Sequence, residues 1–157
     1  MSHQLEAGEK APNFTLPTQS GESWRLVDAL SEGPVVLFFY PKDETKVCTA
    51  EACSFRDQHE VFADSGASVV GVSSDSVGSH KRFAEHHRLP YTLLSDVGGK
   101  VRKQFGIKKT LGLFDGRVTF VIDRDGTVRH AFSSALNAQA HVEEALRTVR
   151  ELTAEAS

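Results

Sequence analysis

Long apolar runs are missing from this sequence of 157 residues. The longest uninterrupted one, VVLFFY at residues 35–40, is far shorter than the roughly 20 residues that a membrane-spanning helix needs. The first residues, MSHQLEAGEKAPNF, also lack the apolar stretch of a secretory signal. We therefore expect no membrane partner and a cytoplasmic location.

Clusters of basic residues are missing as well. The 18 Lys and Arg residues are outnumbered by 21 Asp and Glu, and they are scattered along the chain without interleaved aromatic residues. This pattern argues against a nucleic-acid partner. The glycine-containing segment GIKKTLGLFDG (106–116) lacks the Gly-Lys-Ser/Thr of a phosphate-binding loop. We expect it to be a loop that leads to Arg117 and forms part of a pocket rim.

The chain has no internal repeat and no Pro-, Gly- or Ser-rich linker, which predicts a single domain over residues 1–157 with a frayed tail at 153–157. Short β-rich segments alternate with segments of helical periodicity. The expected strands are 13–17, 23–26, 34–40, 67–73, a segment beginning at Tyr91, 117–123 and 126–133; the expected helices are 48–63, 76–88, 97–105 and 137–152. This order predicts an α/β, thioredoxin-like fold, with a central mixed β-sheet flanked by helices and an N-terminal β-hairpin.

Cysteine is scarce, and its two occurrences lie together, at Cys48 and Cys53, directly after the apolar strand. A lasting structural disulfide is not expected in a reducing compartment. Thr45 is a suitable N-cap, which would place Cys48 in the first turn of a helix. Backbone N–H groups and the helix dipole favour the thiolate form at that position.

The five-residue spacing also constrains the two thiols. On an α-helix they would point about 140° apart, with Cα atoms about 8–9 Å apart, whereas a disulfide needs less than about 7 Å. A bond between Cys48 and Cys53 would therefore require the start of the helix to unwind.

From spacing alone, two interpretations remain open: a redox pair, or two small apolar residues that simply pack. Zinc is less favoured, because two cysteines and His59 lack the usual paired spacing. His59 would lie about 16 Å along the helix from Cys48, too far to serve as its base. His80, His86 and His87 fall in a helix rich in charged residues and are expected on a solvated face, so we predict no metal site.

The segment FFYPKDETKVCTAEACSFRD resembles the active-site segment of peroxiredoxins, in the branch called bacterioferritin comigratory protein or PrxQ. The P-x-x-x-T-x-x-C pattern of the family is met by Pro41, Thr45 and Cys48, and the second cysteine of the branch by Cys53. Further similar blocks are KAPNFTLP, VVGVSSDS, LLSD and RVTFVIDRDG, in the same order. One difference is Lys46-Val47, where the branch commonly has Pro-Gly.

The resemblance implies a thiol-dependent peroxidase without cofactor or metal. Cys48 would be the peroxidatic nucleophile, oxidised by hydrogen peroxide or an organic hydroperoxide to a sulfenic acid, and Cys53 would resolve it as an intrachain disulfide. Thr45 would hydrogen-bond the peroxide and Cys48 through its hydroxyl, and Pro41 would shield the pocket from water. Arg117 would stabilise the thiolate and polarise the peroxide, with Glu51 orienting it.

The resemblance also implies a thioredoxin-type dithiol as the reductant and a monomeric protein. The alternative function is a non-catalytic thioredoxin-fold module, in which the Cys48–Cys53 disulfide switches partner binding. A switch would need two thiols but no arginine beside one of them.

Overall fold

The strand Val35–Phe39 (β3) lies at the centre of the sheet in the computed structural model, which describes residues 3–109 and 116–156. Its five apolar residues are all fully buried, as expected for a central strand. Ser68–Ser73 (β4) pairs with it in parallel and Val118–Ile122 (β6) antiparallel. Thr92–Ser95 (β5) and Val128–Ser133 (β7) complete the order β5-β4-β3-β6-β7.

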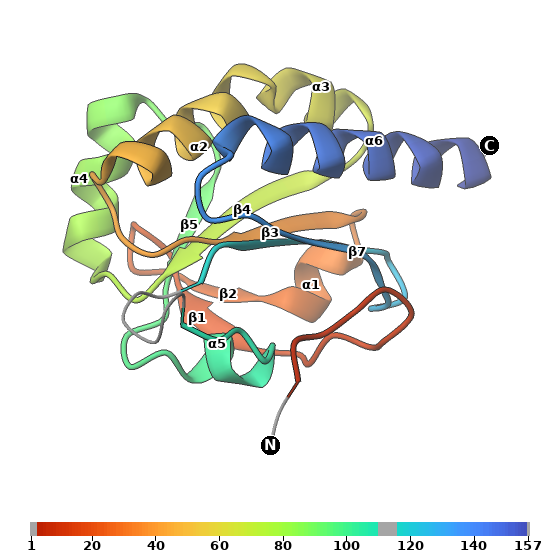
Figure 1. The fold of residues 1–157 in the computed structure, drawn as a ribbon, viewed down its shortest axis with the longest axis horizontal. Helices are drawn as coiled ribbons and strands as arrows, with labels where there is room; N and C mark the ends of the chain where they lie inside the picture. Colours follow the sequence, from red (N-terminus) through yellow and green to blue (C-terminus); the bar gives the residue numbers. More distant parts are fainter. Residues whose placement is uncertain (1–2, 110–115, 157) are drawn as a thin grey trace.

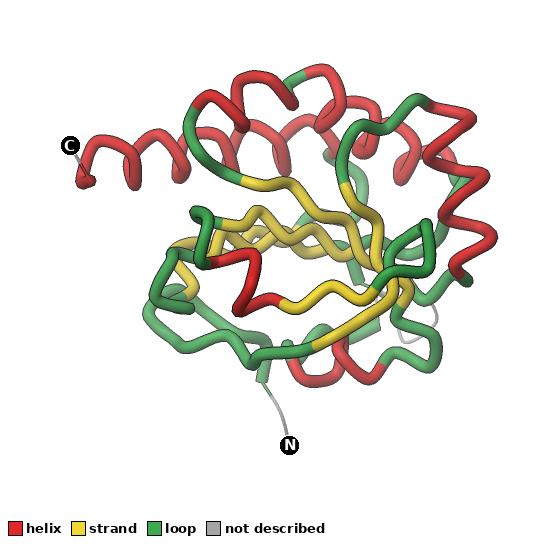
Figure 2. The backbone as a smooth tube through the Cα atoms, turned by 180° about the vertical axis from the view of Figure 1, so that it is seen from behind, coloured by secondary structure: helices red, strands yellow, loops and turns green. Residues whose placement is uncertain are grey.

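Helices cover both faces of this mixed sheet (Figure 1). One face is covered by Lys46–Asp57 (α2), His59–Asp64 (α3), Val77–His87 (α4) and Ala138–Ala156 (α6). The opposite face is covered by the antiparallel hairpin of Thr15–Pro17 (β1) and Ser23–Arg25 (β2), and by the short helices Leu26–Leu30 (α1) and Lys100–Gln104 (α5). The same layers are visible from behind in Figure 2.

Alternation along β3 divides the core between these two faces. Val36 and Phe38 pack with the buried side of α2 and α6, whereas Leu37 and Phe39 pack with the hairpin side. At the end of the strand, Phe39 pairs with both Val72 and Val118. The chain leaves the sheet at this point. The loop before α2 and the start of β6 therefore lie at the same end of the strands.

The predicted fold class is confirmed, and the predicted elements occur in the predicted order, but the short helix α1, which begins at Leu26 where a strand was expected, was not predicted. The helix expected over 48–63 is interrupted at Gln58, whose φ of −103° and ψ of 7° are not helical. Phe55 and Phe62 remain fully buried on either side, with ring centroids 5.9 Å apart, so one apolar stripe continues across the break. The helix expected from 97 begins at Lys100, because Gly98 and Gly99 have φ values of 88° and 74°.

Helix α6 extends to Ala156, beyond the expected end at residue 152. The single domain and the frayed tail at 153–157 stay predictions. Within the described residues, no helix combines the length and the apolar character needed to cross a membrane.

Candidate active site

Cys48 lies in the first turn of α2, immediately beyond the loop that follows β3. Thr45 occupies the N-cap position with an extended backbone (φ −81°, ψ 156°), as predicted. The thiol is 1% exposed and belongs to the core on the α2 side of the sheet. Cys48 is therefore buried beside the N–H groups of the first turn of α2.

Arg117 precedes β6 and reaches the thiol from the neighbouring strand. Its Nη2 donates to the Sγ atom of Cys48 at 3.2 Å, and its Nη1 donates to Oε1 of Glu51 at 2.6 Å. The Nε atom donates to the carbonyl oxygen of Ala135 at 3.0 Å. Because all three nitrogens have partners, the guanidinium is held in one orientation. The structure thus brings together Cys48, Glu51 and Arg117.

Glu51 is completely buried one helical turn beyond Cys48. Burial raises the pKa of its carboxyl to about 7, although the charge and hydrogen bond of Arg117 act in the opposite direction. Its Oε2 atom has no hydrogen-bond partner among the described residues, and it lies 3.5 Å from Nδ1 of His141. The carboxyl therefore titrates near neutrality beside the thiol.

His141 in α6 is a member of this cluster that the sequence did not indicate. Its Nε2 must donate to the carbonyl oxygen of Ser134 at 2.8 Å, and its Nδ1 lies 2.8 Å from the hydroxyl of Thr119. Burial lowers the pKa of His141 to about 4, and the charge of Arg117 acts in the same direction. The sequence feature that could have identified His141 is its position on the apolar stripe of α6, four residues before Ala145.

Glu51 and His141 should give opposite pH dependences of stability. The folded-state pKa of Glu51 is raised from 4.5 to about 7, so its contribution to stability falls as pH rises between these values. The folded-state pKa of His141 is lowered from 6.5 to about 4, so its contribution rises with pH over that interval. In the wild type the two largely cancel in the window where they overlap.

We therefore expect Glu51→Gln to make the free energy of unfolding rise with pH more steeply than in the wild type, and His141→Gln to make it fall. The slope of each should differ from the wild-type slope by roughly 1 kcal/mol per pH unit. Urea unfolding at several pH values within the window common to the two intervals measures both slopes. Parallel curves for the two variants and the wild type would contradict this assignment.

Thr45 and Pro41 lie in the same loop, and the Thr45 hydroxyl makes a different contact from the one that the resemblance implies. The Thr45 side chain is exposed, and its hydroxyl donates to the carbonyl oxygen of Lys42 at 2.8 Å. Within the described residues it makes no hydrogen bond to Cys48 and does not cap α2. Pro41 is half-buried, two residues after the end of β3. The positions agree with the predicted pattern, whereas the Thr45 hydroxyl is directed to the loop itself.

Cys53 is half-buried on the same helix, and both cysteines are free thiols. Beside it, the buried hydroxyl of Tyr91 donates to the carbonyl oxygen of Ala52 at 2.7 Å. The start of α2 lacks the features that usually stabilise a helix end. It has no side-chain cap, no acidic residue in the first turn, and begins with the basic Lys46. The first turns of α2 are therefore held by their buried contacts, such as those of Cys48 and Glu51 with Arg117, and not by capping.

The loop before Thr45 is attached to α4 by a buried polar network. Asp43 accepts from the hydroxyl of Tyr40 at 2.6 Å and from that of Ser79 at 2.9 Å, and its Oδ2 lies 2.7 Å from Nδ1 of His80. The other ring nitrogen of His80 donates to the carbonyl oxygen of Leu94. His80 is 0% exposed, so the prediction of a solvated face was wrong for this residue. The many charged residues of this helix suggested a solvated face, although the position of His80 faces the core.

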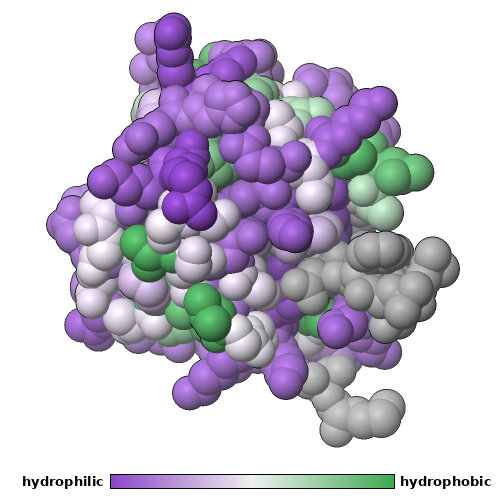
Figure 3. Space-filling model, turned by 90° about the vertical axis from the view of Figure 1, so that its left-hand side faces the viewer, coloured by the Kyte–Doolittle hydropathy of each residue, from purple (hydrophilic) through white to green (hydrophobic). Residues whose placement is uncertain are grey.

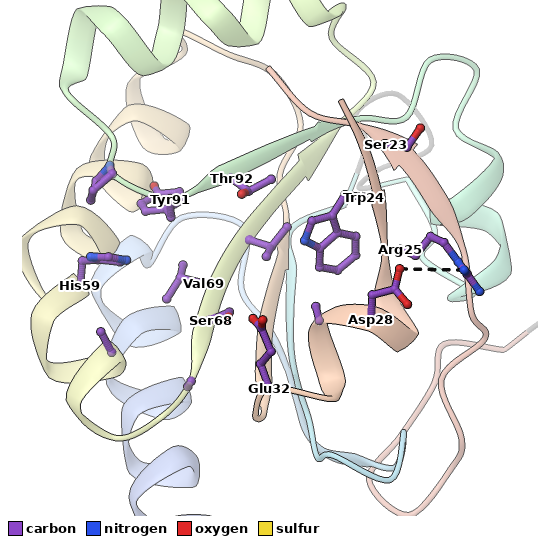
Figure 4. Close-up of a pocket in the computed structure, with 15 residues that line it drawn as sticks. Ser23, Trp24, Arg25, Asp28, Glu32, His59, Ser68, Val69, Tyr91 and Thr92 are labelled. Atoms are coloured by element: carbon purple, nitrogen blue, oxygen red, sulfur yellow. Dashed lines mark ion pairs between the residues drawn. The ribbon is translucent and has the colours of Figure 1, made fainter. Parts of the chain in front are cut away.

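Other predicted features lie away from the thiols. His59 is half-buried at the core edge, as predicted. A cavity of about 510 Å³ lies between the hairpin, β4 and α3. Figure 4 shows Trp24 at this cavity, with His59 and Tyr91 at its other end. Trp24 packs against Phe14 with ring centroids 5.6 Å apart.

A second cavity, of about 430 Å³, is lined by Arg117, Lys108 and Gly116, among others. The segment 106–116 therefore does contribute to the edge of a cavity beside Arg117, at its two ends. The central part of the predicted rim, residues 110–115, lies outside the described residues.

Comparison with known proteins gives consistent matches. The AhpC/TSA family model matches residues 7–131. The chain is 43% identical over 150 residues to the chloroplastic peroxiredoxin Q of Triticum aestivum, covering 95% of this chain and 69% of that protein. Its identity to the chloroplastic peroxiredoxin Q of Arabidopsis thaliana is 44% over 148 residues, covering 94% and 68%.

Solved structures agree with this result. The crystal structure of peroxidoxin BcpB from Mycobacterium tuberculosis matches with a TM-score of 0.89 and 46% identity, covering 95% of this chain and 99% of that one. A structure of peroxiredoxin Q from Xanthomonas campestris matches with a TM-score of 0.82 and 28% identity, covering 89% and 91%. The chain therefore belongs to the AhpC/TSA family, with the peroxiredoxin Q and bacterioferritin comigratory proteins as relatives, and is a thiol-dependent peroxidase.

Proposed function

We propose that Cys48 is the peroxidatic residue and that Cys53 resolves its oxidised form as an intrachain disulfide. The substrates are hydrogen peroxide and organic hydroperoxides, and a thioredoxin-type dithiol restores both thiols. The observation that supports this assignment best is the donor–acceptor distance of 3.2 Å between Arg117 Nη2 and the buried Sγ of Cys48. The alternative of a non-catalytic switch provides no reason for that contact, and the family is one of peroxidases.

In the first half-reaction the Cys48 thiolate attacks the terminal oxygen of the peroxide. The S–O bond forms, the O–O bond breaks, and the leaving oxygen departs as water or an alcohol after gaining a proton. Negative charge thus moves from sulfur to the leaving oxygen. Arg117 is positioned to stabilise this charge because its guanidinium already contacts Sγ.

Glu51, Thr45 and Pro41 would support the reaction between Cys48 and the peroxide. Glu51 orients Arg117 through the 2.6 Å contact with Nη1. Thr45 would hydrogen-bond the peroxide after its hydroxyl leaves the carbonyl oxygen of Lys42, and Pro41 would limit access of water from the strand end. These assignments come from the family pattern together with the positions of the residues around α2.

In the second half-reaction the Cys53 thiolate attacks the sulfenic sulfur of Cys48. An S–S bond forms and the sulfenic oxygen leaves as water. The uncapped start of α2 supports this step, because a missing side-chain cap lowers helix stability by about 1 kcal/mol. Unwinding of the first turns then brings the two sulfur atoms together.

One equivalent of hydrogen peroxide should therefore reduce the helical far-UV circular dichroism of the wild type, and a dithiol should restore it. The expected loss corresponds to part of α2, which has 12 residues. Cys53→Ser is the matched control, because it can form the sulfenic acid but not the disulfide. An unchanged spectrum in the wild type, with the disulfide formed, would contradict unwinding.

We also propose that the protein is a cytoplasmic monomer. In the described part of the chain, the large apolar residues that are exposed are Val27, Val97 and Leu136, and they belong to three separate segments. Scattered apolar residues of this kind do not form the continuous patch of an obligate interface. Light scattering of the reduced protein tests the monomer, and a mass twice that of the chain would contradict it.

A further inference from the structure

Three potential metal ligands converge where the active-site loop meets the end of α4. The carboxylate of Glu44 lies 2.9 Å from Nδ1 of His86 and 2.8 Å from Nε2 of His87. One ligand atom from each residue lies within 4.8 Å of the other two. His86 and His87 are consecutive in the chain, and Glu44 is 42 residues before His86. The fold therefore assembles this group from two distant segments.

The backbone on both sides of the group is unusual. Among the described residues, the non-glycine residues with positive φ are Glu44, at 63°, and Arg88, at 52°. Glu44 is itself a member of the group, and Arg88 is the C-cap directly after His87. Such conformations cost free energy in residues with a side chain, and they are often found where function requires a geometry. At Glu44 this conformation falls on a member of the group itself, whose carboxylate lies against the end of α4.

As an ion pair alone, the group would have a modest effect on stability. The side chains of His86 and Glu44 are 66% and 45% exposed, and exposed ion pairs contribute little. The rings of His86 and His87 have centroids 4.2 Å apart, so two protonated rings would repel each other. Hydrophilic side chains dominate the face on which α4 lies, so an ion in solution can approach it (Figure 3).

When the two histidines are neutral, their ring nitrogens can bind a metal ion. Two imidazole nitrogens and one carboxylate form a donor set that binds zinc, with a fourth position open to water. Ligand atoms around zinc are about 3.4 Å apart in tetrahedral geometry, so the Glu44 carboxylate would move only a few tenths of an ångström away from each histidine nitrogen. A second group, Asp43, Asp75 and His80, is less suitable, because internal hydrogen bonds already occupy its ligand atoms.

We propose that Glu44, His86 and His87 bind a divalent transition-metal ion of the zinc class and thereby fasten the active-site loop to α4. Glu44 lies two residues before Lys46, the first residue of α2. A bound ion would hold the start of this helix in place and oppose its unwinding. This consequence rests on the proposed resolution by Cys53, whereas binding of the ion does not.

Isothermal titration of zinc chloride into the full-length Cys48→Ser/Cys53→Ser protein tests the site without thiol ligands. We expect one equivalent to bind, and affinity to fall at least tenfold in the same protein carrying Glu44→Gln or His87→Gln. His130→Gln is the matched control, because His130 and Glu144 form a comparable pair, 3.0 Å apart, between β7 and α6. Absence of binding, or equal affinity in all variants, would overturn the proposal.

The effect on the loop is measured as the rate of disulfide formation after one equivalent of peroxide. Zinc should slow this rate several-fold in the wild type but not in His86→Gln/His87→Gln. Equal slowing in both proteins would mean that zinc acts on the thiols. No slowing in a zinc-loaded wild type would show that the ion does not fasten the loop. Either result overturns the proposed effect of the ion on the loop. If the disulfide fails to form even without zinc, the proposed role of Cys53 has failed instead.

Discussion

Replacement of Cys48 by serine is expected to abolish peroxide turnover, lowering the rate at least about a thousandfold. A hydroxyl in the position of the thiol remains protonated and is a weak nucleophile, even with Arg117 within hydrogen-bond distance. The Sγ atom is the acceptor in that 3.2 Å contact, so the substitution removes the reacting atom and keeps the surrounding geometry. Steady-state consumption of hydrogen peroxide with a thioredoxin system measures the loss.

Cys53→Ser is the matched control for this experiment. It makes the same chemical change on the same helix, at a half-buried position outside the Arg117 contact. We expect it to react once with peroxide and then to stall with thioredoxin, because no resolving thiol remains. If Cys48→Ser retains a substantial rate while Cys53→Ser is inactive in the first reaction, the two roles have been assigned in the wrong order.

The second large effect is expected from Arg117. Removal of one preorganised donor to a developing negative charge typically lowers the rate by about 10²–10³-fold. Arg117→Lys should recover only part of this, because an ammonium group cannot reproduce the fixed fork that contacts both Cys48 and Glu51. The measurement is the rate of Cys48 oxidation by stopped flow, which separates this step from resolution.

Any variant that removes Arg117 also affects Glu51, its buried partner. Arg117→Met leaves a fully buried carboxylate without its partner, and breaking a buried pair costs about 3–5 kcal/mol. The double variant Arg117→Met/Glu51→Gln removes that charge and keeps the fold comparable. Arg129→Gln, which removes a half-exposed arginine of β7 from its ion pairs, serves as the control. An unchanged oxidation rate in the double variant would refute the role of Arg117.

The sequence predicted the fold because its signals are local. The short apolar run VVLFFY, with Gly33 and Pro34 before it and Pro41 after it, indicates a buried strand, and the glycines and prolines between segments mark their ends. The grouping of Cys48 with Arg117 is different in kind. These residues are 69 positions apart, so only the family resemblance indicated their contact. The order of β3 and β6 in the sheet is what makes this contact possible.

The contacts that were missed depend on side-chain direction. His80 belongs to a helix whose sequence is rich in charge, yet its position faces the core and Asp43 compensates its burial. His141 was hidden in the same way on α6, and the pairing of Glu44 with His86 requires a left-handed residue that no turn signal marked. The hydroxyl of Thr45 was expected at the thiol but lies on Lys42. Such details follow from packing, which sequence periodicity does not determine.

The most direct test of the account is peptide mapping by mass spectrometry after the reduced protein reacts with one equivalent of hydrogen peroxide. The account predicts a Cys48–Cys53 disulfide within each wild-type chain, and in Cys53→Ser a sulfenic acid confined to Cys48. A wild-type protein that consumes peroxide but forms its first oxidation product at Cys53, or leaves Cys48 reduced, would contradict it.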